Sequence, residues 1–140
     1  MPNQDLPQVL GIFLCERVLL DVLRRDTISC INIHNGMTVQ DFPAIVPLVF
    51  AFAQVSGSTR GFSYRFRLVD RLSQIIAESP VAKVEALPSR FLTHKVISAF
   101  PGLVFKEEGM YNIVLLLDGT EVASLPFHVQ QGTPEPSASA

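Results

Sequence analysis

Four arginines stand close together in the middle of the chain: Arg60, Arg65, Arg67 and Arg71. Arg65 and Arg67 are two residues apart in GFSYRFRLVD, so an extended strand places both side chains on one face. Arginine donates several hydrogen bonds to carboxylates and is enriched in protein interfaces. The four side chains are therefore candidate contacts for an acidic partner protein. The alternative is a solvated face whose arginines pair with glutamates across a sheet.

The other reactive side chains do not form a recognisable catalytic or metal-binding pattern. A nucleophile needs a base and an orienting group beside it, and zinc needs ligands at characteristic spacings. The histidines, His34, His94 and His128, form no HxH or HExxH motif, and the chain has no GxSxG elbow. We predict no catalytic residue, metal site or cofactor, and we assign the histidines structural or surface roles.

The two cysteines, Cys15 and Cys30, are too few for a disulfide framework and do not form a CxxC pair. Both lie in apolar segments, which is typical of buried free thiols in a reducing compartment. The apolar run 9–15 has no preceding Lys or Arg and is far shorter than the roughly 20 residues that span a bilayer. We predict a cytoplasmic protein without a membrane partner.

The charge balance argues against nucleic acid as a ligand. The chain has 140 residues, a net charge of −2 and few aromatic residues among its arginines, whereas nucleic-acid-binding domains are usually basic. The segment GSTRG (57–61) could resemble a phosphate cradle, but no helix is predicted after it. We predict a hairpin loop there.

The elements that position these side chains are predicted to be strands. Apolar and polar residues alternate with a period of two in 62–68. The segment 46–55 is apolar on both faces, which favours a central strand or one covered by a neighbour. Residues 27–33 are expected to pair with the preceding ERVLLDVL, and 93–100 is expected to form a strand that stops at Pro101-Gly102.

About seven to nine short strands favour a single antiparallel β-sandwich of the Greek-key, immunoglobulin-like type. A closed barrel is the alternative for the whole chain, and a helix is the alternative for 69–79. We predict a loose lead-in at 1–8, the sandwich domain at 9–130 and a disordered tail, rich in Pro and Ser, at 131–140.

The segment EEGMYNIVLLLDGTEVASLPFHV (107–129) predicts a final hairpin that turns at Asp118-Gly119. A two-residue turn in simple register would mix polar and apolar residues on both faces of the hairpin. Because burial decides strand register, we predict a three-residue loop with Gly119 in a left-handed bulge. One face would then combine Tyr111, Ile113 and Leu115 with Ala123, Leu125, Phe127 and Val129.

Ahead of this hairpin, Glu107, Gly109 and Tyr111 have the spacing of a tyrosine corner. In Greek-key sandwiches, the hydroxyl of such a tyrosine bonds to the backbone a few residues upstream. We therefore predict a structural role for Tyr111 rather than a catalytic one.

The chain resembles a family of uncharacterised bacterial β-sandwich proteins over roughly 15–129. The similarity includes the Gly-x-Tyr, Asp-Gly and closing Pro-Phe-x-Val elements of the last hairpin. In the first part of the chain it includes Asp21, Ser29, Ile31, Asn32, Phe42 and Pro43. The family usually has a glycine turn after the Asp of FRLVD, where this chain has Arg71-Leu72. The resemblance implies a fold but no activity and no catalytic residues.

These observations favour a non-catalytic protein that binds another protein or itself, because exposed strand edges can be paired by a partner. A sandwich that binds a small molecule or carbohydrate is the alternative. It is disfavoured because the chain has no Trp and Tyr64 belongs to a buried alternation. An enzyme is the least favoured class.

Overall fold

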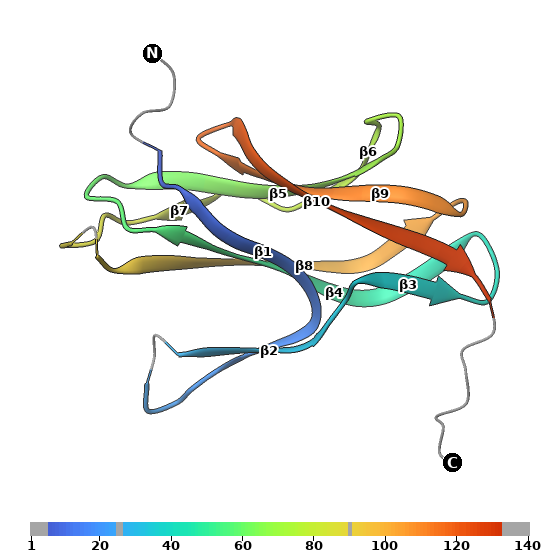
Figure 1. The fold of residues 1–140 in the computed structure, drawn as a ribbon, viewed down its shortest axis with the longest axis horizontal. Coiled ribbons are helices and arrows are strands. Elements are labelled where there is room, and N and C mark those ends of the chain that lie inside the picture. Colours follow the sequence, from blue (N-terminus) through green and yellow to red (C-terminus); the bar gives the residue numbers. More distant parts are fainter. Residues whose placement is uncertain (1–5, 25–26, 90, 133–140) are drawn as a thin grey trace.

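The chain forms a β-sandwich whose two sheets pack face to face (Figure 1). The computed structural model describes residues 6–24, 27–89 and 91–132, all of which lie in strands, turns or loops. The first sheet contains, in spatial order, β2 (Ile28–Ile33), β1 (Val9–Leu20), β4 (Ala44–Ser56) and β8 (Thr93–Phe105). The second sheet contains, in spatial order, β3 (Gly36–Val39), β10 (Thr120–Gln131), β9 (Gly109–Leu117), β5 (Phe62–Asp70) and β6 (Ile75–Glu78), and β7 (Ala82–Val84) also pairs with β5. The predicted all-β sandwich is confirmed, whereas the helix at 69–79 and the closed barrel are wrong.

The described residues form ten strands, more than the seven to nine predicted, because short strands such as β3 carry little pattern. β3 runs parallel to the end of β10, so the second sheet is mixed rather than purely antiparallel. Gly36 makes this pairing possible: a Cβ at that position would lie 2.9 Å from the carbonyl oxygen of His128.

The strand order matches that of an immunoglobulin-like sandwich with one position vacant. β1, β4 and β8 follow each other as strands A, B and E do, and β5, β9 and β10 as strands C, F and G do. In immunoglobulin domains strand D pairs with strand E. No strand of the described residues occupies that position, so β8 is the edge of the first sheet.

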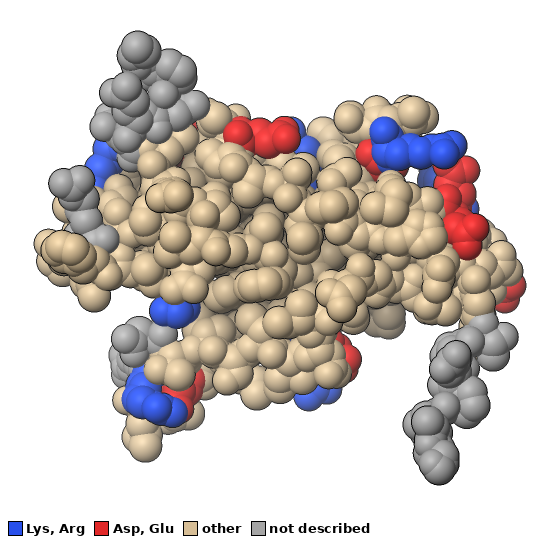
Figure 2. All heavy atoms as spheres, in the orientation of Figure 1, with Lys and Arg blue, Asp and Glu red and all other residues tan. Residues whose placement is uncertain are grey.

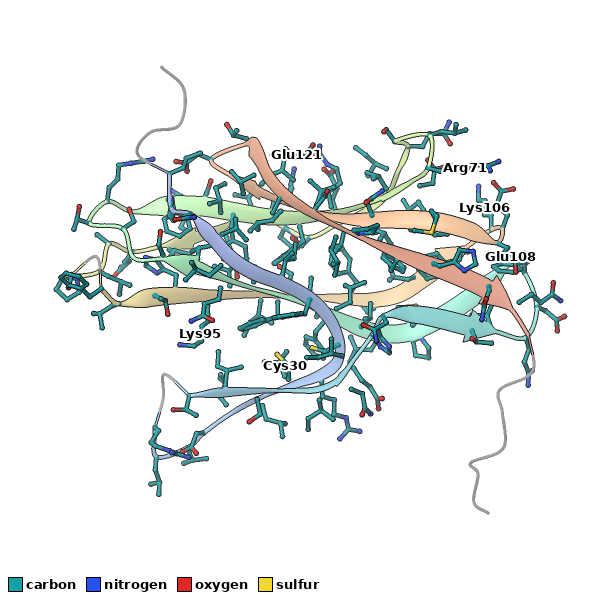
Figure 3. The ribbon with its side chains drawn as sticks, in the orientation of Figure 1. Cys30, Arg71, Lys95, Lys106, Glu108 and Glu121 are labelled. Carbon is teal, nitrogen blue, oxygen red and sulfur yellow. The ribbon has the colours of Figure 1, made fainter. Side chains whose placement is uncertain are left out.

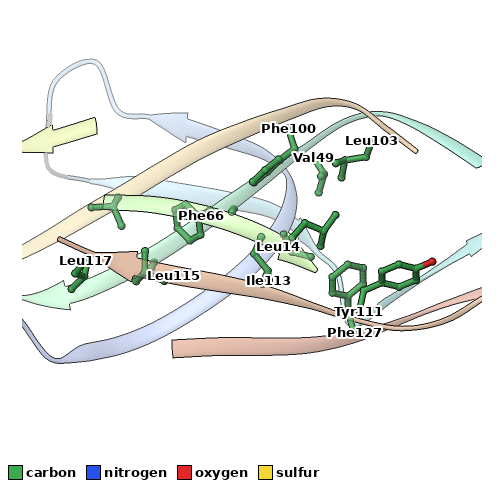
Figure 4. Close-up of a cluster of buried hydrophobic side chains, with 14 of the residues drawn as sticks. Leu14, Val49, Phe66, Phe100, Leu103, Tyr111, Ile113, Leu115, Leu117 and Phe127 are labelled. Atoms are coloured by element: carbon green, nitrogen blue, oxygen red, sulfur yellow. The ribbon is translucent and has the colours of Figure 1, made fainter. Parts of the chain in front are cut away.

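The core lies between the sheets and is filled by alternate residues of the long strands (Figure 4). Tyr111 and Phe127 stack with ring centroids 5.9 Å apart, and Phe105 meets the ring of Tyr111 edge-on at 4.9 Å. The Tyr111 hydroxyl donates a 2.5 Å hydrogen bond to the carbonyl oxygen of Glu107. The predicted tyrosine corner is therefore confirmed, in the strand that corresponds to immunoglobulin strand F.

The prediction that a strand stops at Pro101-Gly102 is wrong, because β8 continues to Phe105. Proline is tolerated within an edge strand, where its missing N–H removes no ladder hydrogen bond. Gly102 adopts a φ of 62°, which a residue with a Cβ rarely takes. Both residues therefore fit an edge strand that bends, and they do not end it.

The final hairpin has the predicted faces but not the predicted turn. Leu117 pairs directly with Thr120, and both Asp118 (φ 49°) and Gly119 (φ 78°) have positive φ, as in a two-residue type I′ turn. The alternation of side chains between the two faces instead shifts at a bulge at Val122, the third residue of β10. Beyond the bulge, the expected pairs form: Ala123 with Leu115, Leu125 with Ile113 and Phe127 with Tyr111.

The loop 57–61 also differs from the prediction of a hairpin, because β4 and β5 lie in different sheets. The segment is a crossover between the sheets. Its conformation is stabilised by Ser58, whose hydroxyl donates to the carbonyl oxygen of Arg60 and accepts from the Arg60 N–H.

The strands extend from Val9 to Gln131, close to the expected domain 9–130. Part of the expected lead-in already contacts the sandwich: the Ser56 N–H donates to the Gln8 carbonyl oxygen, and the Gln8 N–H donates to the Ser56 hydroxyl. The remaining lead-in residues 1–5 and the tail 133–140 lie outside the described residues.

Candidate interaction surfaces

Arg65 and Arg67 lie, as predicted, on the outer face of β5, but both already have partners within the chain. The Arg67 Nε is 2.7 Å from a carboxylate oxygen of Glu78 on β6, and an Arg65 Nη is 3.7 Å from the same oxygen. The Arg65 Nε also donates to the carbonyl oxygen of Ser79 at 2.9 Å. One glutamate thus serves two arginines across the β5–β6 ladder.

The stems of these arginines cover apolar residues of the neighbouring strand β9. Arg65 pairs with Leu116 and Arg67 with Val114 in the β5–β9 register, so each pair shares the outer face. Leu116 and Val114 are only 6% and 5% exposed, although the outer face has no third layer among the described residues. Arginine stems commonly shield apolar surface in this way while the charged group remains in water.

Arg60 lies at one end of the sandwich, where it pairs with the turn of the final hairpin. Its Nη2 is 3.0 Å from the Asp118 carboxylate, which also accepts the Ser63 backbone N–H at 2.8 Å. These groups, the Ser63 N–H foremost, hold the pKa of the Asp118 carboxyl below its usual value. The same contacts dock the type I′ turn against the start of β5, which explains why the turn keeps two residues.

Arg71 is exposed in the turn after β5, and no ion pair with another described residue involves it. The four arginines therefore do not form one cluster. Three of them form ion pairs within the second sheet, and Arg71 alone among the four is both exposed and without an ion pair to another described residue.

The outer face of the first sheet, unlike that of the second, exposes apolar side chains. Ile45 and Leu48 of β4 are 70% and 43% exposed. Phe50 and Phe52 follow Leu48 along β4. Phe52 pairs with Phe13 of β1, and the two rings stack with their centroids 6.3 Å apart. From the side of the sandwich that Figure 2 shows, charged side chains lie toward the ends of the molecule, along its upper edge and around the β1–β2 hairpin, and the middle is uncharged.

The β1–β2 hairpin extends this apolar area away from the body (Figure 1). Val22 and Leu23, after β1, are 88% and 92% exposed. We refer to the exposed residues of the face and hairpin together as the apolar surface: Phe13, Leu19, Leu20, Val22, Leu23, Ile33, Ile45, Leu48 and Val104.

Cys30 lies on the side of the β1–β2 hairpin that faces the body of the sandwich (Figure 3). Burial, together with the neighbouring Cys30 thiol, raises the pKa of the Cys15 thiol to about 12. Since thiolates are the reactive form, Cys15 is an inert core residue. The predicted burial holds for Cys15, whereas Cys30 is partly exposed, and both thiols are free.

A groove of about 670 Å³ separates β6 from β8, at the side of the sandwich where both sheets end. Its apolar lining includes Ile76, Phe100 and Leu103, and its polar rim includes Asp70 and Glu107. It lies where an immunoglobulin strand D would pair with β8.

These surfaces belong to a domain that a family model matches over residues 10–130. The chain belongs to DUF6941, a family of unknown function. The resemblance to an uncharacterised family is thereby confirmed. No curated protein matches the chain. The DUF6941 match covers nearly the whole sandwich, so both outer faces and the groove fall within it.

The histidines of this DUF6941 chain do not come together. His94 is 6% exposed, its ring meets Phe62 edge-on at 4.9 Å, and its Nε2 has no hydrogen-bond partner among the described residues. Burial lowers the pKa of His94. In the part of the chain that the structure covers, no three His, Cys, Asp or Glu side chains are placed to hold a metal ion. That part also contains no helix long and apolar enough to cross a membrane.

Sequence patterns pointed to the arginines and missed the two other surfaces. The segment 46–55 did show apolar residues on both faces, which is consistent with the apolar surface, but a covering layer explains the same pattern. The groove has no sequence pattern, because residues more than twenty positions apart line it.

Proposed function

We propose that this protein is a non-catalytic binding module whose partner is another protein chain, self-association included. The observation that carries the proposal is the apolar surface. Soluble monomeric proteins rarely expose large contiguous apolar areas, and areas of this kind usually mark interaction sites. The apolar surface continues from a sheet onto a projecting hairpin, so a partner can pack on the sheet and contact the hairpin at the same time.

The arginines of the second sheet support this assignment indirectly. Arg65, Arg67 and Arg60 are engaged by Glu78 and Asp118, so binding an acidic partner would compete with existing ion pairs. We therefore place the main protein contact on the first sheet and retain Arg71 as an additional candidate contact. A sandwich that binds a small molecule or carbohydrate is the second candidate, favoured by the volume of the groove.

We also propose a reducing compartment, such as the bacterial cytoplasm, as the location. Cys15 and Cys30 are neighbours and yet both are free thiols. Alkylation of the protein in freshly lysed cells, followed by mass spectrometry, is expected to find both cysteines reduced. Recovery as a disulfide would contradict this location.

Site-specific photocrosslinking tests the binding function in cells that express the protein. A benzophenone side chain at Leu48, on the apolar surface, is expected to form a covalent adduct with a protein. The matched control carries it at Ser124, which is exposed on β10 and paired with Val114 on the outer face of the second sheet. An adduct of twice the chain mass identifies self-association, and any other discrete mass identifies a different partner. Failure of Leu48 to form a discrete adduct would contradict the proposal.

A further inference from the structure

We propose that the free edge of β8 accepts an extended segment of another protein, which pairs with the strand and fills the groove beside β6. The segment completes the first sheet at the vacant D position. This inference rests on the proposed protein-binding function but uses the edge of β8 and the groove, which share only Val104 with the apolar surface among the described residues. The two sites can therefore be tested with different residues.

The sheet topology provides the first argument. β8 has thirteen residues and pairs only with β4, so one whole side of its backbone has no partner strand among the described residues. Natural sandwiches usually shorten, cover, charge or bend such an edge, or place proline on it, because it can pair with another chain. Pro101 and Gly102 interrupt the edge at one point, and eight residues of β8 precede them. Residues 99–104 include no charged side chain that would discourage pairing.

The backbone polarity of β8 provides the second argument. In an antiparallel strand, the N–H and C=O of one residue point to the same side, and the side alternates along the chain. The Ile97 carbonyl accepts a 2.9 Å hydrogen bond from the Tyr64 hydroxyl of the opposite sheet, so this residue faces the free edge. By alternation Ala99 also faces that edge, and so does Pro101, which has no N–H to lose. The Ala99 N–H and C=O form no hydrogen bond that lies outside the sheet ladders of the described residues.

The groove is bounded by the edges of the two strands rather than by their faces. Six consecutive residues of β8, 99–104, line it, and so do residues 74–78 on the other side. Side chains of consecutive residues point alternately to the two faces of the sheet, so a consecutive run can line the groove only where the backbone itself reaches it. An extended segment laid along this edge would form main-chain hydrogen bonds with β8 and direct alternate side chains toward Ile76, Phe100 and Leu103.

The charges around the groove define the chemistry of the segment. Asp70 and Glu107 lie near the Tyr111 hydroxyl, whose pKa is raised by burial and further by these two carboxylates. Glu78 is neutralised by Arg67, and Lys106 is the one cation among the described residues that line the groove. The favoured segment is therefore apolar at alternate positions and carries a Lys or Arg that reaches Asp70 and Glu107.

A phage-displayed library of random linear peptides, selected on the full chain, tests the proposal. Selected peptides are expected to alternate apolar residues and to share a Lys or Arg. On binding, the Ile97 and Ala99 amides should become protected from hydrogen exchange. Methylating the peptide nitrogens that face β8 should weaken binding about 10-fold or more, whereas methylating those at the other alternate positions should not.

Two matched variants test the position of the charge. Glu107→Lys is expected to weaken peptide binding about 10-fold, because it reverses the acidic end of the groove. Glu85→Lys, a control that is also exposed but lies outside the groove, should not weaken it. Leu20→Ser, on the hairpin part of the apolar surface, should leave peptide affinity unchanged.

Four results would overturn the proposal. Three are the absence of any selected peptide, binding that leaves the β8 amides exchangeable, and protection of Ala99 without peptide, which would assign the edge to a second copy. The fourth is insensitivity to backbone methylation, which would show that the peptide does not pair with the strand. None of these results affects the crosslink expected from Leu48, so the proposed function can stand when this inference fails.

Discussion

The outer faces of the two sheets differ in how their apolar residues are covered. Each sheet has apolar residues on the side that faces away from the core. On the second sheet, Leu116 and Val114 lie under arginine stems whose charged groups are held by Glu78. On the first sheet, Ile45 and Leu48 have no such cover and remain in contact with water.

This difference changes where a partner is expected. A charged face looks functional in the sequence, but its charges can be consumed by internal ion pairs and by the shielding of apolar neighbours. An apolar residue on a strand looks like core in the sequence, but it becomes a contact surface when the fold provides no covering layer. The first sheet is thus the better candidate for binding.

The largest expected effect of a substitution is on the stability of the second sheet. Arg65→Glu/Arg67→Glu places three carboxylates together and uncovers Leu116 and Val114. Leaving charged groups unpaired in a partly buried site is expected to lower the free energy of unfolding by about 3 kcal/mol. Urea denaturation measures this loss. Arg71→Glu is the matched control and should stay within about 0.5 kcal/mol of wild type. Equal effects of the two variants would show that the arginines do not hold the sheet.

The second prediction concerns the apolar surface. Ile45→Ser/Leu48→Ser is expected to weaken binding of the crosslinked partner about 100-fold, since each side chain contributes on the order of 1.5 kcal/mol when buried. The free energy of unfolding of the isolated chain should change little, because both side chains are exposed in it. Isothermal calorimetry and urea denaturation measure the two quantities. A stability loss without a binding loss would assign these residues to the fold instead.

The third prediction concerns Asp118, which ties the second sheet together at its end. Asp118→Ala removes the acceptor for Ser63 and Arg60 and places alanine at a φ of 49°. The combined loss in stability is expected to be about 2 kcal/mol. Asp118→Asn keeps an acceptor oxygen and tolerates the left-handed backbone, so it should lose less than half as much. Equal losses in thermal denaturation would mean that the charge, rather than the turn geometry, is what stabilises the site.

The smallest effect is a pH dependence that belongs to the core rather than to either face. The pKa of buried His94 lies below 6.5, so the unfolded chain binds a proton at a higher pH than the folded chain does. The melting temperature should therefore fall as the pH decreases from about 6.5 toward the lowered pKa, and level off below it. His94→Leu should remove this slope. Asp118, whose pKa is also lowered, contributes stability that is lost only as the pH falls below 3.8.

Much of the fold was predictable because burial acts on local patterns. The alternation in 62–68 predicted β5 and its outer arginines, and the faces of the final hairpin followed from burial alone. The two-residue turn is the one that Asp-Gly favours locally, and contacts between Asp118 and Ser63 also hold it in place. The prediction of the turn was wrong because it assigned the change of alternation to the turn instead of to the strand after it. The bulge then formed at Val122, where it restores the burial pattern.

The sequence by itself determined that this chain is an all-β sandwich with a tyrosine corner at Tyr111, because strand periodicity and corner spacing are local properties. Only the tertiary structure decided which arginines are paired, which apolar strand face is uncovered and which strand is an edge. Those outcomes depend on which segments become neighbours across the sheets, and the same local pattern is compatible with a covered or an open neighbour. The candidate sites of this protein are therefore properties of the assembled sandwich, above all of the open first sheet and the free edge of β8.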